Sequence, residues 1–111
     1  MPGDFFRIVH SLVLSIPSGM VMTYGGIARF LGRPGAARMV VYALRSTPPG
    51  VSIPWHRVVG ADGRIPKRSS FADADEHLLQ ESMLRSEGTP FTAGGKVDLS
   101  LCLWEPDESV P

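Results

Sequence analysis

Apolar residues at the start of the chain recur every three or four positions. This spacing places side chains on one face of an α-helix. The positions are Phe5, Ile8, Val9, Leu12, Val13 and Ile16. Pro17, Ser18 and Gly19 follow and should end the segment. The pattern predicts a first helix over residues 5–16 with one buried face.

A second, shorter helical segment follows Thr23, which suits the N-cap position because its hydroxyl can accept a hydrogen bond from the first turn. Gly32 is expected to end this helix, and Pro34-Gly35 to form the turn after it. The inward residues of this helix are Ile27, Phe30 and Leu31.

A third helix is predicted over residues 36–45, with an apolar side formed by Val40, Val41 and Leu44. Arg38, Tyr42 and Arg45 are spaced i, i+4 and i+7, so they share the opposite face. Two short helices joined by a glycine-containing turn, the second with an arginine-rich outer face, indicate a helix-turn-helix.

The remaining pattern predicts a wing, a last helix and an extended tail. Residues 57–65 are expected to form a small β-hairpin around Ala61-Asp62-Gly63. Residues 71–87 are expected to be helical, closed by Gly88, with Leu78, Leu79, Met83 and Leu84 inside. Alternation at Val97, Leu99, Leu101 and Leu103 suggests a short strand or an extended tail. The fold class expected is mainly α with a small β-hairpin, a winged helix-turn-helix in a single domain over residues 1–111.

Composition narrows the class of protein. With 111 residues and 43% apolar residues, the chain can bury one core. No stretch approaches the ~20 apolar residues needed to cross a membrane, and no secretion signal is indicated. The lone Cys102 excludes an internal disulfide and fits a reducing compartment. We expect a protein of the cytoplasm, associated with the nucleoid, in a bacterium, or of the nucleus in a eukaryote.

The net charge of zero conceals a division of charge along the chain. Residues 5–68 carry nine basic residues against one acid, Asp62, whereas residues 69–111 carry nine acids against Arg85 and Lys96. Nearly all the basic residues are arginines, whose planar guanidinium groups suit phosphates and bases. The basic part suits a polyanion such as DNA, although solvated surface arginines would give the same pattern.

The segment Pro54-Trp55-His56-Arg57-Val58-Val59 carries the most specific signal. It resembles the acceptor loop of O6-alkylguanine-DNA alkyltransferases, with tryptophan in the position of their reactive cysteine. This substitution makes the chain similar to the alkyltransferase-like proteins in particular. Further matching segments, in the same order, are Thr23-Tyr24, Ala36-Ala37-Arg38, Arg45 with Pro48, and Glu87-Gly88.

The resemblance implies a docking role for the third helix. A lesion inside a duplex is unreachable, so its reader must flip the nucleotide out and replace the lost stacking. Arg38 is similar to the family's arginine finger, which enters the vacated space through the minor groove. The alternative for Arg38 is a phosphate contact or a solvated side chain. The expected DNA-binding residues are Tyr24, Arg38, Met39, Tyr42 and Arg45.

The resemblance also implies a pocket for the flipped base. The expected lining residues are Tyr24, Pro54, Trp55, His56, Val58, Arg68 and Ser69. Tyr24 would press on the neighbouring phosphate, or else be a half-buried core residue. Trp55 would contact the base or its alkyl group, or else only fill space.

Three further residues have roles that the resemblance implies. Arg68 would sense the lesion through its cation, or bind a phosphate. His56 and Glu87 match the residues that activate the cysteine in the enzymes. Without a thiol, they are expected to brace the loop.

The expected function is therefore recognition of O6-alkylguanine in double-stranded DNA without alkyl transfer. The chain is expected not to be an enzyme and to need no cofactor or metal. The resemblance further implies hand-over to nucleotide excision repair damage-recognition proteins. The chain is expected to act as a monomer and to have no membrane partner. A winged-helix regulator of DNA and a residual alkyltransferase or hydrolase are the alternatives.

Overall fold

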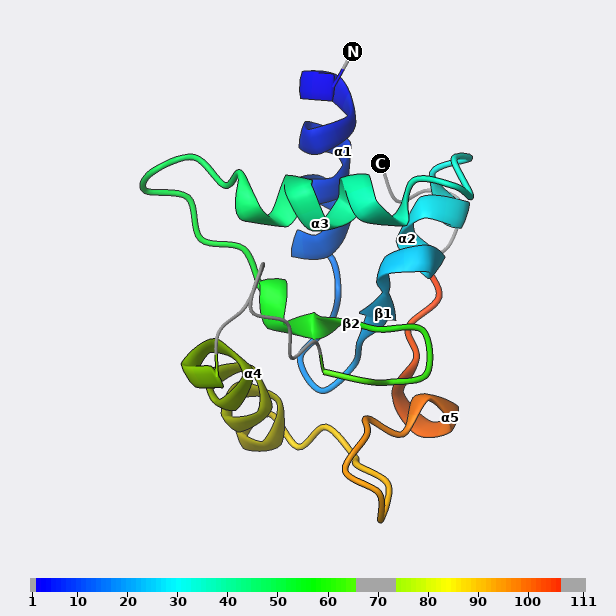
Figure 1. The fold of residues 1–111 in the computed structure, drawn as a ribbon, viewed down its shortest axis with the longest axis vertical. Helices are drawn as coiled ribbons and strands as arrows, with labels where there is room; N and C mark the ends of the chain where they lie inside the picture. Colours follow the sequence, from blue (N-terminus) through cyan, green and yellow to red (C-terminus); the bar gives the residue numbers. More distant parts are fainter. Residues whose placement is uncertain (1, 66–73, 107–111) are drawn as a thin grey trace.

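The computed structural model describes residues 2–65 and 74–106, and it is mainly helical (Figure 1). Its elements in chain order are α1 (Pro2–Leu14), β1 (Met22–Thr23), α2 (Tyr24–Phe30), α3 (Ala37–Arg45), the 3-10 turn η1 (Trp55–Arg57), β2 (Val58–Val59), α4 (Ala74–Ser86) and α5 (Leu99–Cys102). No helix in the described part of the chain is long and apolar enough to cross a membrane.

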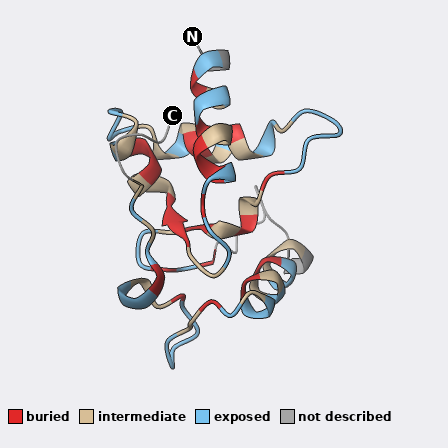
Figure 2. Ribbon diagram, turned by 180° about the vertical axis from the view of Figure 1, so that it is seen from behind, coloured by how far each residue is buried: buried red, intermediate tan, exposed pale blue. Residues whose placement is uncertain are grey.

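The first three helices enclose the main core. Figure 1 shows α3 lying across α1, with α2 beside it. The predicted face of α1 is buried, apart from Ile8, which is 42% exposed. The Nε2 atom of His10 on α1 lies 2.6 Å from the carbonyl oxygen of Ala43 on α3. Packing and this polar contact together fix α3 against α1, and the buried surfaces of the helices face inward in Figure 2.

The local signals that delimit α2 are confirmed. The Gly26 backbone N–H donates to the Thr23 hydroxyl at 2.9 Å, which is the expected N-cap. Gly32 follows the helix with a positive φ of 78°, a conformation that glycine adopts without steric cost. The turn that joins α2 to α3 is therefore encoded locally.

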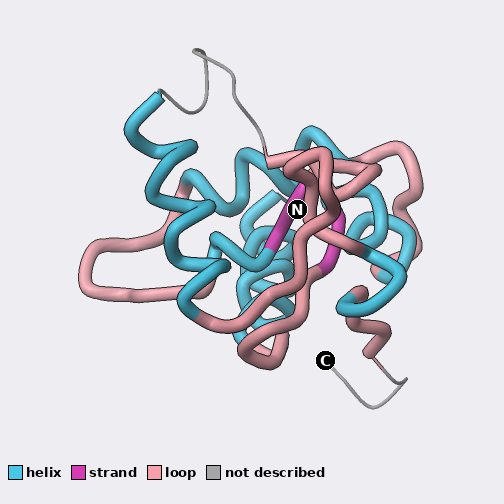
Figure 3. The backbone as a smooth tube through the Cα atoms, turned by 90° about the horizontal axis from the view of Figure 1, so that it is seen from below, coloured by secondary structure: helices cyan, strands magenta, loops and turns pink. Residues whose placement is uncertain are grey.

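The wing differs from the predicted hairpin. After β2 the chain makes a tight turn over residues 60–64, in which the Gly60 N–H donates to the Arg64 carbonyl at 2.7 Å. The strand β2 pairs instead with β1, in parallel, with Met22 beside Val58 and Thr23 beside Val59. Both β2 residues are fully buried, and pairing with β1 places them at the centre of the molecule, as Figure 3 shows. The winged helix-turn-helix architecture is confirmed, with a two-stranded parallel sheet in place of the hairpin.

The buried face of α4 agrees only in part with the one predicted: Leu84 is fully buried as expected and Met83 is half-buried, but the other two leucines are not inside. Leu78 and Leu79 are 62% and 52% exposed, whereas Gln80 is only 4% exposed and lies on the same side as the buried Leu84. This helix packs against η1, whose backbone offers polar atoms rather than apolar surface. Its inner face is therefore selected by hydrogen bonding as well as by hydrophobicity. Gly88 closes the helix as predicted, with a φ of 82°.

The C-terminal segment forms a short helix where an alternating strand was expected. Asp98 caps α5 by accepting a hydrogen bond from the Ser100 N–H at 3.1 Å. As a result, Leu101 is 70% exposed and Cys102 is buried. The chain then pairs beside β1, where the Trp104 N–H donates to the Val21 carbonyl at 2.8 Å. The alternation prediction is thus wrong for Leu101, because the side chains follow a helical turn.

Candidate nucleic-acid interface

The outer face of α3 carries the predicted stripe. Arg38, Tyr42 and Arg45 are all exposed, while Val40 and Ala43 on the other side are fully buried. Met39, also predicted to bind DNA, is half-buried and packs against the main core. Its position four residues before Ala43 turns it inward, so its side chain does not belong to the exposed stripe.

Arg45 lies at the end of this face and pairs with Glu76 of α4. Its Nη2 atom is 2.8 Å from Glu76 Oε1, and Nη1 is 3.4 Å from Oε2. Tyr24 lies close to both charges and packs against the core. Burial raises the pKa of Tyr24 to about 12, with Arg45 opposing the shift and Glu76 adding to it. The Tyr24 phenol is therefore neutral at physiological pH and can donate a hydrogen bond.

Trp55 opens the 3-10 turn η1. Pro54 precedes this turn, and the Arg57 N–H donates to the Pro54 carbonyl at 3.0 Å. The Trp55 ring meets the His56 ring edge-on, with centroids 6.2 Å apart and planes at 84°. Trp55 is half-buried, so part of its indole surface is accessible.

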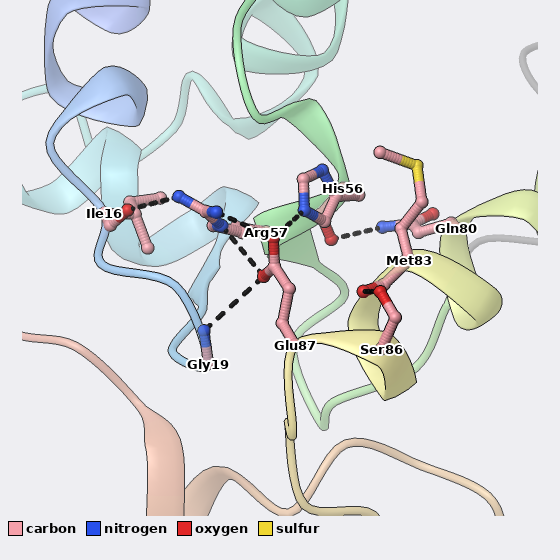
Figure 4. A network of polar contacts seen from close by, with 8 residues as sticks. All are labelled: Ile16, Gly19, His56, Arg57, Gln80, Met83, Ser86 and Glu87. Atoms are coloured by element: carbon pink, nitrogen blue, oxygen red, sulfur yellow. Dashed lines mark hydrogen bonds and ion pairs between the residues drawn. The ribbon is translucent and has the colours of Figure 1, made fainter.

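Glu87 joins this turn to the rest of the molecule (Figure 4). Its carboxylate accepts hydrogen bonds from Arg57 Nη2 at 2.7 Å, Arg57 Nε at 3.0 Å and His56 Nε2 at 2.8 Å. Arg57 Nη1 also donates to the Ile16 carbonyl at 2.8 Å. The hydrogen bonds from Arg57 are the main cause that lowers the pKa of Glu87 to about 2, with His56 adding to the effect. The predicted bracing of the loop by His56 and Glu87 is the arrangement found.

The hydrogen bond with Glu87 assigns a proton to one ring nitrogen of His56. Because Glu87 is ionised and can only accept, His56 Nε2 carries the proton in their hydrogen bond. In the neutral ring Nδ1 is then an acceptor. That atom is buried and has no hydrogen-bond partner among the residues that the structure describes.

Gln80 is a second support for the loop, and the sequence reasoning missed it. Its Nε2 atom donates to the carbonyl oxygens of His56 at 3.1 Å and Val58 at 3.0 Å. These two carbonyl oxygens lie on either side of Arg57, so a single amide side chain holds the backbone around Arg57 in place. The available signal was spacing: Glu87 directly follows α4 and lies seven residues after Gln80, a helical spacing that places the two on the same side.

A cavity of about 600 Å³ adjoins the loop. Its lining residues are Leu14, Thr47, Val51, Ser52, Ile53, Pro54, Trp55, His56, Arg57 and Met83. Three predicted pocket residues, Pro54, Trp55 and His56, are therefore brought together, whereas Tyr24 is not part of this lining. Val58 is fully buried in the core, so its side chain does not face the cavity. Arg68 and Ser69 lie outside the described residues.

Comparison with known proteins decides the family. Residues 4–89 match the profile described as 6-O-methylguanine DNA methyltransferase, DNA binding domain. The chain belongs to this family. Within it, the chain is of the alkyltransferase-like type. It is 37% identical to alkyltransferase-like protein 1 of Schizosaccharomyces pombe over 107 residues, covering 93% of this chain and 96% of the relative.

Other family members extend the comparison. The DNA base-flipping protein of Escherichia coli is 38% identical over 101 residues, which cover 91% of this chain and 74% of that protein. The structure of Schizosaccharomyces pombe Atl1 with damaged DNA containing O6-carboxymethylguanine superposes with a TM-score of 0.79 at 36% identity, covering 94% of this chain and 97% of Atl1. The chain spans 44% of the length of the Shigella flexneri methylated-DNA–protein-cysteine methyltransferase, at 42% identity over 68% of this chain.

Proposed function

We propose that this alkyltransferase-like chain binds O6-alkylguanine in duplex DNA, flips the modified nucleotide out of the helix and holds it without removing the alkyl group. The Schizosaccharomyces pombe relative solved with O6-carboxymethylguanine DNA supports the choice of lesion. The Escherichia coli relative named for base flipping supports the mode of access.

The presence of tryptophan at position 55 is the observation that supports binding without alkyl transfer. This side chain occupies the acceptor position of a loop that Glu87, His56 and Gln80 hold in shape. An indole has no ionisable thiol, so it cannot take an alkyl group as a cysteine thiolate does. Cys102 offers no substitute: it is buried, and burial raises the pKa of its thiol.

The exposed face of α3 supports docking in the minor groove. Arg38 is held outward on a helix whose opposite side is fixed in the core, so its guanidinium can enter the space left by a flipped base. Tyr24, neutral and close to the end of α3, can donate a hydrogen bond to the phosphate beside that nucleotide.

Binding without repair is useful to the cell only when another activity follows. We therefore include hand-over to nucleotide excision repair proteins in the proposal, with the chain acting as a monomer. The acidic stretch of residues 69–108 is a candidate contact surface for such a partner. In the structure, Glu76 and Glu81 already pair with Arg45 and Arg85, which leaves little free charge at these two positions.

Two measurements test this function. Mixing the protein with duplexes carrying radiolabelled O6-methylguanine should leave the label in the DNA. Label on the protein, or released to solution, would show transfer or hydrolysis and refute the binder. The second measurement compares affinity for modified and unmodified duplexes of one sequence. Equal affinities would instead identify a general or sequence-reading DNA-binding protein.

A further inference from the structure

Tyr42 occupies the middle of the exposed stripe of α3. It lies one helical turn after Arg38 and three residues before Arg45, and it is 38% exposed. In the proposed docking of α3, Tyr42 follows Arg38 on the face of the helix that meets the groove. Its aromatic ring is the largest apolar group on this face of the helix.

The backbone beneath Tyr42 is held firmly. Its neighbour Ala43 is fully buried, and the Ala43 carbonyl contacts His10 Nε2 of α1 at 2.6 Å. Val40, two residues earlier, is also fully buried in the main core. The helix cannot tilt Tyr42 away from DNA without breaking its packing against α1.

We propose that Tyr42 is a specificity-determining residue that reads a base pair near the lesion from the minor groove. This inference rests on the proposed docking of α3. An A·T pair presents only the acceptors adenine N3 and thymine O2 there, whereas a G·C pair adds the guanine N2 amino group. The Tyr42 hydroxyl donates to these acceptors, and the amino group obstructs the ring. Tyr42 therefore favours A·T over G·C.

The position of the pair that Tyr42 reads follows from helix geometry. Four residues of α-helix rise about 6 Å, while successive base pairs are about 3.4 Å apart. With Arg38 in the gap left by the flipped nucleotide, Tyr42 reaches the first or second pair beside it. The effect should occur on one side of the lesion, because α3 has a fixed direction in the groove.

The experiment varies one flanking pair at a time around O6-methylguanine, at the first and second positions on both sides. Each position carries A·T, G·C or I·C, where the hypoxanthine base lacks the N2 amino group but retains the other edge of guanine. The wild-type protein should bind A·T and I·C flanks about 3- to 10-fold more tightly than G·C at one position. Equal affinity for all three pairs, or I·C behaving as G·C, would overturn the proposal.

Two variants separate the hydroxyl from the ring. Tyr42→Phe should lose most of the preference, because lesions flanked by A·T lose the hydrogen bond from the hydroxyl, and Tyr42→Ala should lose the preference completely. Full preference in either variant would refute the reading role of Tyr42. Thermal unfolding checks that both variants are folded. Loss of lesion preference across every flank in the wild type would refute the proposed function instead, so the two failures are distinguishable.

Discussion

Glu87 illustrates how individual residues determine the form of the recognition loop. Its carboxylate binds both Arg57 and His56, and its side chain is only 17% exposed. A largely buried charge is stable there because two nitrogen atoms of Arg57 and one of His56 satisfy it. In this chain the network supports the loop that carries Trp55.

Glu87→Gln should destabilise the protein by about 2–4 kcal/mol at pH 7, because Arg57 loses its charged partner inside the fold. The pKa of Glu87 is lowered from 4.5 to about 2, so its contribution is complete above about pH 4.5 and is lost as the pH falls toward 2. Urea unfolding at pH 7 and pH 3 should show a smaller difference between variant and wild type at the lower pH. The matched control is Glu81→Gln, which removes only an exposed pair with Arg85. If the variant were less stable than the wild type by the same amount at both pH values, the electrostatic role of the network would be contradicted.

Arg38→Ala should abolish most of the preference for lesion DNA while leaving stability unchanged, because Arg38 is exposed and fills the gap only in the complex. Competition binding between modified and unmodified duplexes measures this preference. Arg85→Ala removes one positive charge from α4 and serves as the control. If Arg38→Ala weakened binding to both duplexes by the same factor, Arg38 would be a phosphate contact and not a finger.

At the scale of elements, α4 is organised by polar groups that its apolar pattern does not reveal. Leu78 and Leu79 are exposed, while Gln80 is buried between them and the acceptor loop. The helix packs on η1, where unpaired carbonyl oxygens would be costly to bury. Gln80 donates to the His56 carbonyl of η1 and to the Val58 carbonyl of β2, so the buried face of α4 is the one that carries its amide.

Two substitutions at neighbouring positions of α4 test whether Gln80 determines which face of the helix is buried. Gln80→Leu should destabilise the protein by about 2–4 kcal/mol, because the carbonyls of His56 and Val58 lose their donor inside the protein. Leu79→Gln, the converse change at an exposed site, should cost less than about 0.5 kcal/mol. Chemical denaturation of both variants provides the comparison. A greater cost for Leu79→Gln would show that the apolar pattern, and not Gln80, sets the buried face.

At the scale of the molecule, charge is distributed so that one part can meet DNA. Arg45, Arg57, Arg64, Arg85 and Lys96 pair with acids. The arginines for which the described residues show no acidic partner belong to α1, α2, the turn after α2, and α3. They are Arg7, Arg29, Arg33 and Arg38. Zero net charge is therefore compatible with a basic surface on the helix-turn-helix.

Binding should consequently weaken with salt in proportion to the phosphates contacted. Four contacts give a slope of about −3.6 in a plot of log K against log salt, or about 100-fold weaker binding between 50 and 200 mM. Titrations of one lesion duplex at several salt concentrations measure the slope. Arg33→Ala should reduce its magnitude by about one, whereas Lys96→Ala, which removes a charge already paired with Asp62, should not. A flat response would refute the electrostatic role of this surface.

Prediction from sequence succeeded where the signal is local. Thr23 and Gly32 mark the ends of α2 through backbone hydrogen bonding and φ, and the i, i+4, i+7 stripe of α3 points outward as expected. Prediction failed where the structure depends on contacts between segments that lie far apart in the sequence. The partner of β2 is β1 and not the chain that follows it.

The sequence by itself determined the helices near its N-terminus, the exposed arginines and the identity of the Trp55 loop, because caps, turns and helical spacing act over a few residues. Only the tertiary structure decided what supports that loop. Gln80 and Glu87 reach His56, Arg57 and Val58 across more than 20 residues of chain. Their role depends on which face of α4 is buried. That face is determined by the carbonyl oxygens of η1 and β2, which only folding brings together beside the helix.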